Sequence, residues 1–273
     1  MSSLVQRLLT AVALIPLVVW LVLFSPTSVF TVVLSLIILI GGYEWAALSG
    51  LGNKGYKMLV ALIMLGNSHA LALMDESALN ILMFFSLAFW LIVITLLIIK
   101  AKSLLDTSVN LTFMLLLGQF IVAMTYISLD QIRHGFEQGP GLLMYLLLLI
   151  WIADSGAYFA GRAFGKHKLS SILSPGKSLE GVAGGLLACL AFSFYGAQYF
   201  TINDNVLFIL LSVFIAFVSV YGDLFESLMK RRAGVKDSGN ILPGHGGILD
   251  RIDSLIAASP VFLACMFLTD WFV

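Results

Sequence analysis

The sequence predicts an all-α, polytopic integral membrane protein. Three observations carry this prediction: 60% of the 273 residues are hydrophobic, only 11% are charged, and the mean hydropathy is +1.02. Soluble globular proteins carry about 25% charged residues, so this composition outweighs a length that would also suit one or two soluble domains. The formal net charge of zero argues against nucleic-acid binding, which needs a basic face.

Nine segments are apolar enough to form helices that cross a bilayer, which takes roughly 20 residues each. The first ends at Ser25-Pro26 and the second follows at once, without the small-residue cleavage site of a signal peptide. We therefore expect the first segment to be a retained helix. The expected spans cover residues 8–24, 27–48, 57–74, 78–99, 109–129, 141–161, 181–200, 205–226 and 254–272.

Lys and Arg are distributed unevenly between these segments. If the N-terminus is cytoplasmic, every Lys and Arg except Arg133 falls on the cytoplasmic side. Cytoplasmic loops carry the excess of positive charge in membrane proteins, so we expect this orientation. The cytoplasmic set is Arg7, Lys54, Lys57, Lys100, Lys102, Arg162, Lys166, Lys168, Lys177, Lys230, Arg231, Arg232, Lys236 and Arg251.

The unusual polar residues lie in the second half of the chain. We expect residues 1–140 to be a lipid-embedded scaffold of transmembrane helices, and residues 141–273 to be a transmembrane catalytic region with cytoplasmic loops 162–180 and 227–253. Cys189 and Cys265 lie in apolar runs without metal-ligand spacing and are expected to pack. Compactness and the lack of a targeting segment favour a bacterial inner (plasma) membrane, with a eukaryotic organelle as the open alternative.

Residues 223–253 are the most polar segment, with five of the fifteen Lys and Arg and five of the fifteen Asp and Glu. Asp223, Ser227 and Lys230 follow one another at i, i+4 and i+7, so one helical face presents a carboxylate, a hydroxyl and an ammonium. Asp250 and Asp253 stand at i and i+3 before the last span. This pattern indicates a place where an anionic substrate and a cation meet at the membrane surface.

Carboxylates on two helix ends beside a Gly-rich loop suit Mg²⁺, which takes one or two carboxylates and fills its other positions with water and substrate phosphate. The helix start after Gly246-Gly247 adds free N–H groups and a positive dipole end, which favour phosphate. His245 could act as a general acid or base, donate to phosphate, or shape the loop. A zinc site is not expected, because no cysteine or second histidine lies nearby in the sequence.

Acids inside expected spans are candidates for function, because a central Asp costs about 2.5–3.5 kcal/mol to insert. The alternative is that the side chain reaches the membrane surface or forms a structural pair with Arg or Lys. We prefer this alternative for Glu44, which stands beside Gly41-Gly42 and Trp45. The four acids within or at the ends of spans are Glu44, Asp154, Asp223 and Glu226.

The loop after the sixth span is rich in Gly, Ser and Lys. Gly176-Lys177-Ser178 resembles the end of a phosphate-binding P-loop, but residue 171 is Ser instead of the required Gly and a helical span precedes it. Lys177 therefore has two open interpretations. It holds a phosphate, or it is one of the positive charges that fix the orientation in the membrane.

These motifs together resemble a known family, the phosphatidate cytidylyltransferases, also called CDP-diacylglycerol synthases. The downstream part of the resemblance is Ser227-x-x-Lys230-Arg231, Lys236-Asp237 and Pro243-x-His245-Gly246-Gly247-x-x-Asp250-Arg251-x-Asp253. The upstream part is Asp154-Ser-Gly-Ala-Tyr and Ser174-Pro-x-Lys177-Ser-x-Glu180-Gly181. The resemblance extends over the whole chain, but only residues 154–253 are diagnostic.

The resemblance implies transfer of CMP from CTP to phosphatidic acid, giving CDP-diacylglycerol and pyrophosphate, with Mg²⁺ required. It implies a homodimer and K⁺ as a possible second cation. Asp223 and Asp250 would be the metal ligands. The implied catalytic residues are Asp223, Lys230, Lys236, Asp237, His245, Asp250 and Asp253, and the implied substrate-binding residues are Ser227, Arg231, Arg251, Lys177, Ser174 and Asp154.

Two other functions stay open from the residues. A secondary transporter also uses intramembrane acids and glycine-broken helices, but here the acids gather at one membrane face and the first half has no matching broken helix. A CTP-dependent lipid kinase, or a cytidylyltransferase for another lipid phosphate, would need a similar phosphate site. CDP-alcohol phosphotransferases are disfavoured because their Asp-Gly-x-x-Ala-Arg motif is absent from the sequence.

Overall fold

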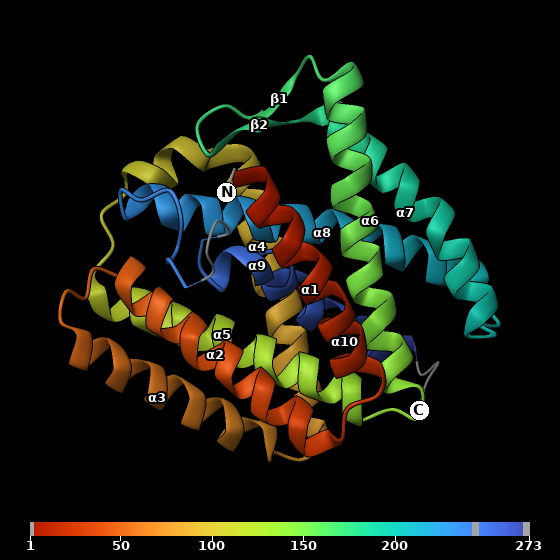
Figure 1. Ribbon diagram of the computed structural model, residues 1–273, viewed down its shortest axis with the longest axis horizontal. Helices are drawn as coiled ribbons and strands as arrows, with labels where there is room; N and C mark the ends of the chain where they lie inside the picture. Colours follow the sequence, from red (N-terminus) through yellow and green to blue (C-terminus); the bar gives the residue numbers. More distant parts are fainter. Residues whose placement is uncertain (1–2, 242–245, 270–273) are drawn as a thin grey trace. The chain divides into compact units, whose positions relative to one another are not determined.

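The computed structural model describes residues 3–241 and 246–269, which are predominantly helical (Figure 1). The helices are α1 (Ser3–Leu23), α2 (Thr27–Leu48), α3 (Lys54–Ala72), α4 (Glu76–Asp106), α5 (Leu111–His134), α6 (Gly139–Phe164), α7 (Leu179–Tyr199), α8 (Asn205–Arg232), α9 (Leu249–Ile252) and α10 (Leu255–Thr269). Two short strands, β1 (Lys168–Ser170) and β2 (Ser174–Ser178), stand between α6 and α7.

Each of the nine predicted apolar segments corresponds to a helix, with ends that differ by several residues. The largest differences are at α8, which continues through the basic residues to Arg232, and at α4, which continues past a kink at Lys100 to Asp106. Within the described ranges, six helices are long and apolar enough to cross a membrane: α2, α4, α5, α6, α7 and α8. The chain is therefore polytopic, and the number of nine spans stays a prediction.

The hairpin of β1 and β2 is a difference from the all-α expectation. The two strands pair antiparallel, with Lys168 opposite Ser178 and Ser170 opposite Ser174. Sequence pattern did not indicate strands, because the segment Ser174-Pro-Gly-Lys-Ser178 contains no apolar alternation of the kind that marks a half-buried strand. The expected Gly, Ser and Lys loop is thus a short, ordered hairpin whose ends meet α6 and α7.

The chain forms two compact units. Unit 1 comprises Met1–Leu79, Ser108–Met144 and Met229–Ile252, and unit 2 comprises Asn80–Thr107, Tyr145–Leu228 and Asp253–Val273. The predicted functional division near residue 140 stays a prediction.

In unit 1, α2, α3 and α5 lie side by side (Figure 1). Trp45 of α2 is 1% exposed, and its indole Nε1 donates to the Met114 carbonyl at 2.8 Å. Gly118 of α5 makes this packing possible, since a Cβ there would overlap the indole ring. A buried Trp whose N–H has a partner contributes a large apolar area without a desolvation cost. This packing fixes the part of α2 next to Glu44.

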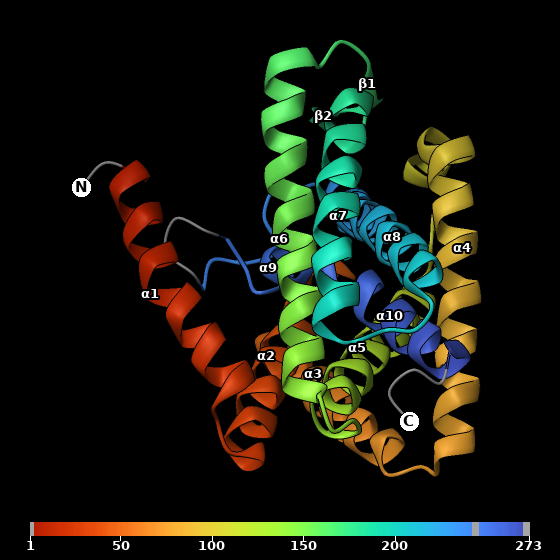
Figure 2. The ribbon, with the colours of Figure 1, turned by 90° about the vertical axis from the view of Figure 1, so that its right-hand side faces the viewer.

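In unit 2, glycines bring α6 and α7 together. A Cβ on Gly156 of α6 would lie 3.1 Å from the Gly184 carbonyl, and one on Gly185 would lie 2.6 Å from the Ala153 carbonyl. Small residues allow close backbone approach of membrane helices. The hairpin connects these two closely packed helices (Figure 2), so both of its ends are attached to packed helices.

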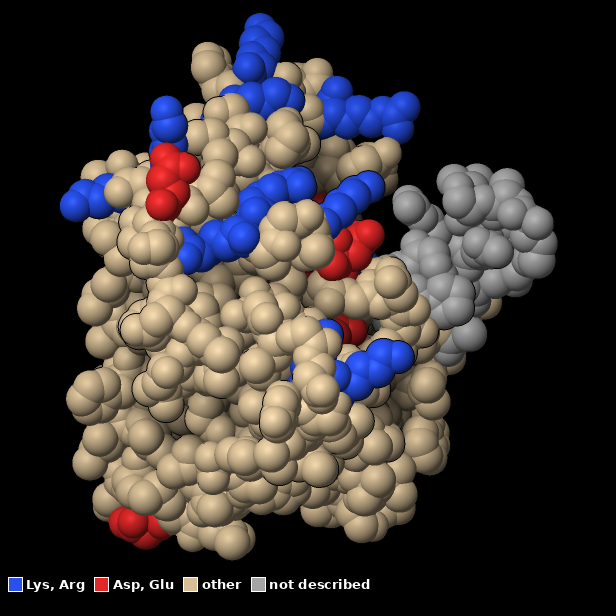
Figure 3. Space-filling model, turned by 90° about the vertical axis from the view of Figure 1, so that its left-hand side faces the viewer, with Lys and Arg blue, Asp and Glu red and all other residues tan. Residues whose placement is uncertain are grey.

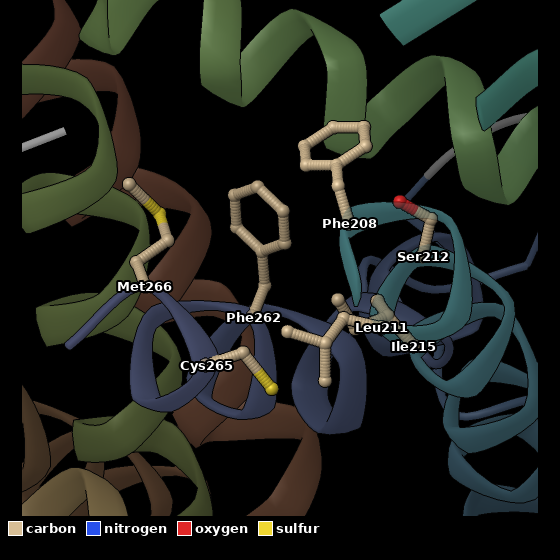
Figure 4. A pocket seen from close by; sticks show the side chains of 7 residues that line it. All are labelled: Phe208, Leu211, Ser212, Ile215, Phe262, Cys265 and Met266. Atoms are coloured by element: carbon tan, nitrogen blue, oxygen red, sulfur yellow. The ribbon is translucent and has the colours of Figure 1, made fainter. Parts of the chain in front are cut away.

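The C-terminal part of α10 packs in unit 2 against α8. Phe208, Leu211, Ser212 and Ile215 of α8 line a small apolar hollow with three residues of α10, Phe262, Cys265 and Met266 (Figure 4). The Ser212 hydroxyl has a hydrogen-bond partner here, because the Tyr145 hydroxyl lies 2.7 Å from Ser212 Oγ. Cys189 and Cys265 are both free and buried, as their apolar surroundings predicted.

Charged side chains interrupt an otherwise uncharged surface on the face shown in Figure 3. Large apolar side chains are widely exposed, among them Phe85, Ile99, Leu116 and Leu187, each at least 64% exposed. A soluble monomer rarely exposes apolar surface of this extent. The exposed apolar residues are consistent with lipid contact.

Candidate functional site

The first candidate cluster lies in unit 2, where the hairpin meets α8. Lys177 Nζ of β2 lies 2.6 Å from Oδ2 of Asp223 on α8, and the two side chains are 27% and 25% exposed. The other oxygen, Oδ1, accepts from Ser227 Oγ at 3.3 Å. The predicted helical face therefore joins Asp223 to Ser227, and an ion pair adds Lys177 from a distant part of the sequence.

Local hydrogen bonds hold the hairpin that carries Lys177. Ser178 is the N-cap of α7 and its Oγ accepts from the Gly181 N–H at 3.1 Å. Glu180 in the next turn accepts from the N–H groups of Lys166 and His167 at 3.1 to 3.2 Å, and lies 2.6 Å from His167 Nδ1. An N-cap of this type stabilises a helix start by about 1 kcal/mol. Both ends of the hairpin are thus tied to the start of α7.

Asp253 lies in the same unit, directly before α10. Gly222 of α8 allows this approach, since a Cβ there would lie 2.6 Å from the Asp253 carbonyl oxygen. Burial, and then the charge of the nearby Asp223 carboxylate, raise the pKa of the Asp253 carboxyl to about 7, although Lys177 opposes the change. Asp154 of α6 also acts on Asp253 as a neighbouring negative charge. Three carboxylates therefore surround one ammonium, an excess of negative charge that favours a cation.

The second candidate cluster lies in unit 1 and is centred on Asp250 of α9. Lys230 Nζ, in the last turn of α8, lies 2.6 Å from Asp250 Oδ1, and the side chains are 14% and 6% exposed. Oδ2 accepts three hydrogen bonds, from the Ser238 N–H at 2.9 Å, the Ser238 hydroxyl at 2.9 Å and the Gly247 N–H at 2.8 Å. One carboxylate oxygen of Asp250 thus binds Ser238 and Gly247, and the other binds the Lys230 ammonium.

Two opposing effects act on the pKa of Asp250. Burial raises it, but the hydrogen bonds from Lys230, Gly247 and Ser238 and the charge of Lys230 together lower it below its ordinary value. Hydrogen bonds to the ionised form favour that form. Asp250 is consequently ionised in the folded chain. Its negative charge can therefore pair with a metal cation or with a lysine ammonium.

Glu44 completes the second cluster, although the sequence pattern does not predict it as a site residue. This side chain of α2 is 3% exposed and accepts from the Ser238 hydroxyl at 3.0 Å and from the N–H groups of Ile248 and Leu249 at 3.0 and 2.8 Å. The preferred interpretation, a side chain that reaches the surface or pairs with Arg or Lys, does not describe these contacts. In the sequence, only the position of an acid at membrane depth marks Glu44 as a candidate for function. No sequence feature marks Ser238.

The other predicted site residues lie outside these two contact networks or outside the described residues. Arg231, Lys236, Asp237 and Arg251 are exposed, and Ser174 is half-buried in the hairpin. His245 falls in residues 242–245, outside the part of the chain that the structure describes. Glu226 is 1% exposed within α8.

Each predicted metal ligand, Asp223 and Asp250, offers carboxylate oxygens, the ligand type that a hard cation such as Mg²⁺ takes. Within residues 3–241 and 246–269, no three His, Cys, Asp or Glu side chains are grouped to enclose a metal ion. Mg²⁺ does not need such a cage, because it binds through one or two carboxylates and keeps water or phosphate at its other positions. Asp223 and Asp250 each hold an ammonium at 2.6 Å, so each carboxylate already has a positive charge where a cation would be held.

Fold and site together define a class: a polytopic membrane protein with two Asp–Lys ion pairs, Asp223 with Lys177 and Asp250 with Lys230. The cytidylyltransferase family model matches residues 5–269, so the chain belongs to the cytidylyltransferase family. It is 38% identical over 281 residues to the phosphatidate cytidylyltransferase of Haemophilus influenzae, with 94% of this chain and 96% of that protein covered.

Two further relatives carry the same name. The phosphatidate cytidylyltransferase of Pseudomonas aeruginosa is 36% identical over 272 residues, which cover 97% of this chain and 98% of that protein. That of Bacillus subtilis is 40% identical over 154 residues, which cover 55% of this chain and 57% of that protein. The family that the sequence motifs indicated is therefore confirmed.

Proposed function

We propose that this protein transfers CMP from CTP to phosphatidic acid, giving CDP-diacylglycerol and pyrophosphate, in membrane phospholipid biosynthesis. The observation that carries the proposal is the ion pair of Lys177 and Asp223 at 2.6 Å, in a chain that belongs to the cytidylyltransferase family. Lys177 lies in one of the motifs that resemble the phosphatidate cytidylyltransferases, and Asp223 lies just before Ser227, where the downstream motif begins. A charged pair at this position is suited to an anionic nucleotide and an anionic lipid.

The reaction joins a phosphate oxygen of phosphatidic acid to the α-phosphorus of CTP. The bond from the α-phosphorus to the bridging oxygen breaks, and pyrophosphate leaves with that electron pair. The attacking oxygen is already ionised near neutral pH, so the protein need not supply a strong base. Positioning and charge stabilisation then provide most of the rate enhancement.

The lysines supply the positive charge that two anionic substrates need. Lys177 and Lys230 each lie 2.6 Å from a carboxylate, and an ammonium group is a hydrogen-bond donor of the kind that phosphate oxygens accept. Exposed Arg231, Lys236 and Arg251 add positive charge for the nucleotide. Ser227, Ser174 and Asp154 are proposed to bind substrate, and Asp237 and His245 are proposed catalytic residues.

Asp223 and Asp250 are the proposed ligands of Mg²⁺, and Asp253 is a further proposed catalytic residue. A bound Mg²⁺ offsets charge on the triphosphate and on the departing pyrophosphate. K⁺ as a second cation, a homodimer, nine spans, a cytoplasmic N-terminus and location in the bacterial inner membrane with the site at the cytoplasmic face are further parts of this proposal.

The test is product analysis with purified protein in detergent, supplied with CTP, phosphatidic acid and either Mg²⁺ or EDTA. We expect CDP-diacylglycerol only with Mg²⁺, and at least 100-fold less from Asp223→Asn, because removal of one charge-stabilising group costs about 10²–10³ in kcat. Lys168→Ala, an exposed hairpin residue, is the matched control and should keep wild-type activity. Wild-type protein that forms no nucleotide-linked lipid contradicts the proposal and directs attention to transport.

A further inference from the structure

The carboxylate of Glu44 is buried and has three hydrogen-bond donors, all from residues about 200 positions later in the chain. They are the Ser238 hydroxyl and the N–H groups of Ile248 and Leu249, at 2.8 to 3.0 Å. Burial of an ionised carboxylate is costly unless hydrogen bonds replace its water. Hydrogen bonds to a charged acceptor are about twice as strong as neutral ones, so these donors account for a buried acid in α2.

These contacts cap α9 from another helix. Ile248 and Leu249 stand at the start of α9, where N–H groups have no partner inside the helix. Normally a residue directly before the helix supplies the cap. Here Glu44 of α2 supplies it, so the position of α9 depends on α2.

Ser238 connects the Glu44 carboxylate to the Asp250 carboxylate. Its hydroxyl lies 3.0 Å from Glu44 Oε2 and 2.9 Å from Asp250 Oδ2. Asp250 in turn holds Lys230 at 2.6 Å. A continuous series of contacts, all within unit 1, thus leads from a scaffold helix to the proposed metal ligand and to a proposed phosphate-binding lysine.

Two glycines leave room for the Glu44 carboxylate. A Cβ on Gly247 would lie 2.5 Å from both Glu44 oxygens, and a Cβ on Gly239 would overlap Glu44 Oε1. Gly41 of α2 contributes on the other side, where a Cβ would lie 3.3 Å from Leu249 Cδ2. Gly41, Gly239 and Gly247 therefore leave the space that the contacts of Glu44 and Leu249 need.

We infer that Glu44 is a positioning residue for the reaction: it fixes Ser238, Ile248 and Leu249 and through them orients Asp250 and Lys230. The inference rests on the proposed function for its catalytic part. Residues 1–140 were expected to be only a scaffold. The inference gives α2, which lies in that region, an effect on the rate of CMP transfer through Asp250 and Lys230.

The kinetic experiment compares Glu44→Gln with Glu76→Gln, an exposed acid in the first turn of α4. A Gln keeps the shape but places an amide N–H₂ against backbone N–H donors. We expect kcat to fall about 10- to 100-fold, with KM for phosphatidic acid changed less than threefold, because small displacements of catalytic groups cost about 10²-fold. Glu76→Gln should match wild type.

The double variant Glu44→Gln/Ser238→Ala tests whether the effect passes through the loop. If it does, the loss in kcat is smaller than the product of the two single losses, since both changes break the same series of contacts. A loss equal to that product overturns the inference. If Glu44→Gln does not fold, Glu44→Asp, which keeps the charge but shortens the reach, takes its place in the same comparison.

Hydrogen exchange provides a readout that does not depend on activity. The amides of Ile248 and Leu249 should exchange at least tenfold faster in Glu44→Gln, while peptides of α3 and α5 exchange as in wild type. Unchanged exchange at residues 246–252 overturns the inference even if the enzyme is active. Faster exchange in a chain without cytidylyltransferase activity supports the capping role and contradicts only the proposed function.

Discussion

Lys177 and Asp223 form an ion pair at 2.6 Å between the β1–β2 hairpin and α8. Each side chain is about one quarter exposed, so the pair is accessible to a ligand and only partly screened by solvent. A pair of this kind contributes little to stability when exposed. Its position, beside Ser227 and two further carboxylates, is the basis on which we propose that it binds phosphate and a cation.

The first prediction concerns the charge of Lys177. Lys177→Ala should lower kcat/KM for CTP about 10- to 100-fold, because one ammonium that screens phosphate oxygens is lost. Lys177→Arg should retain more activity than the Ala variant, since it keeps the charge. Steady-state kinetics with CTP as the varied substrate checks this, and an Ala variant with wild-type kcat/KM would assign Lys177 to membrane orientation alone.

Asp253 should lower the stability of the metal-free protein. Its pKa is raised to about 7 in the folded chain, so the folded state resists ionisation that the unfolded state undergoes near its ordinary pKa of about 4. Asp253→Asn should therefore stabilise the protein in EDTA by on the order of 1 kcal/mol, a few degrees in Tm. The gain should be fully present above pH 7 and absent below about pH 4.

The same Asp253→Asn protein should be nearly inactive, which separates stability from function. Thermal unfolding in EDTA between pH 4 and pH 8, together with product formation at pH 7.5, gives both quantities. A gain in Tm that does not change with pH would show that charge at Asp253 is not its cause.

Asp250 should have the opposite dependence on pH. Its pKa is lowered in the folded chain, so its contribution to stability is present above the unfolded pKa of about 4 and is lost as the pH falls through the folded pKa. We expect Asp250→Asn to lower the free energy of unfolding by about 1–3 kcal/mol at pH 7, because hydrogen bonds to a charged group are lost. The difference from wild type should shrink on acidification below pH 4. A difference in Tm that is constant from pH 3 to pH 7 would contradict this assignment.

The helical elements could largely be predicted from the sequence, because long apolar runs in a membrane protein have few alternatives to helix. The pairing of Asp223 with Ser227 could also be predicted, because four residues along a helix share a face. The hairpin could not, since Ser, Pro, Gly and Lys carry no strand pattern there. The contact of Lys177 with Asp223 could not be predicted either, because the hairpin carries Lys177.

Long-range contacts explain the other differences. Lys230 was expected on one face of a helix with Asp223, and both lie in α8. The contact of the Lys230 ammonium with Asp250 of α9 was not predicted. Glu44 meets Ile248 and Leu249 across about 200 residues of sequence, and no local spacing encodes such a contact. The free-energy cost of an acid at membrane depth marks Glu44 as unusual in the sequence. Only the tertiary structure shows which groups it binds.

The orientation in the membrane gives a prediction that does not depend on catalysis. Lys168→Cys, on the exposed hairpin, should react with a membrane-impermeant maleimide from the cytoplasmic side only, and Asp75→Cys, between α3 and α4, from the opposite side only. The native thiols Cys189 and Cys265 are buried and give little background. Labelling of both positions from the same side would contradict the expected topology.

The origin of the phosphorus in the lipid product tests the central claim most directly. Purified protein is given phosphatidic acid, Mg²⁺ and CTP labelled at either the α- or the γ-phosphorus. We predict that α-label enters the lipid and that γ-label appears only in pyrophosphate. Transfer of γ-label to lipid would identify a CTP-dependent kinase, and label in neither lipid nor pyrophosphate would contradict the assignment as a cytidylyltransferase.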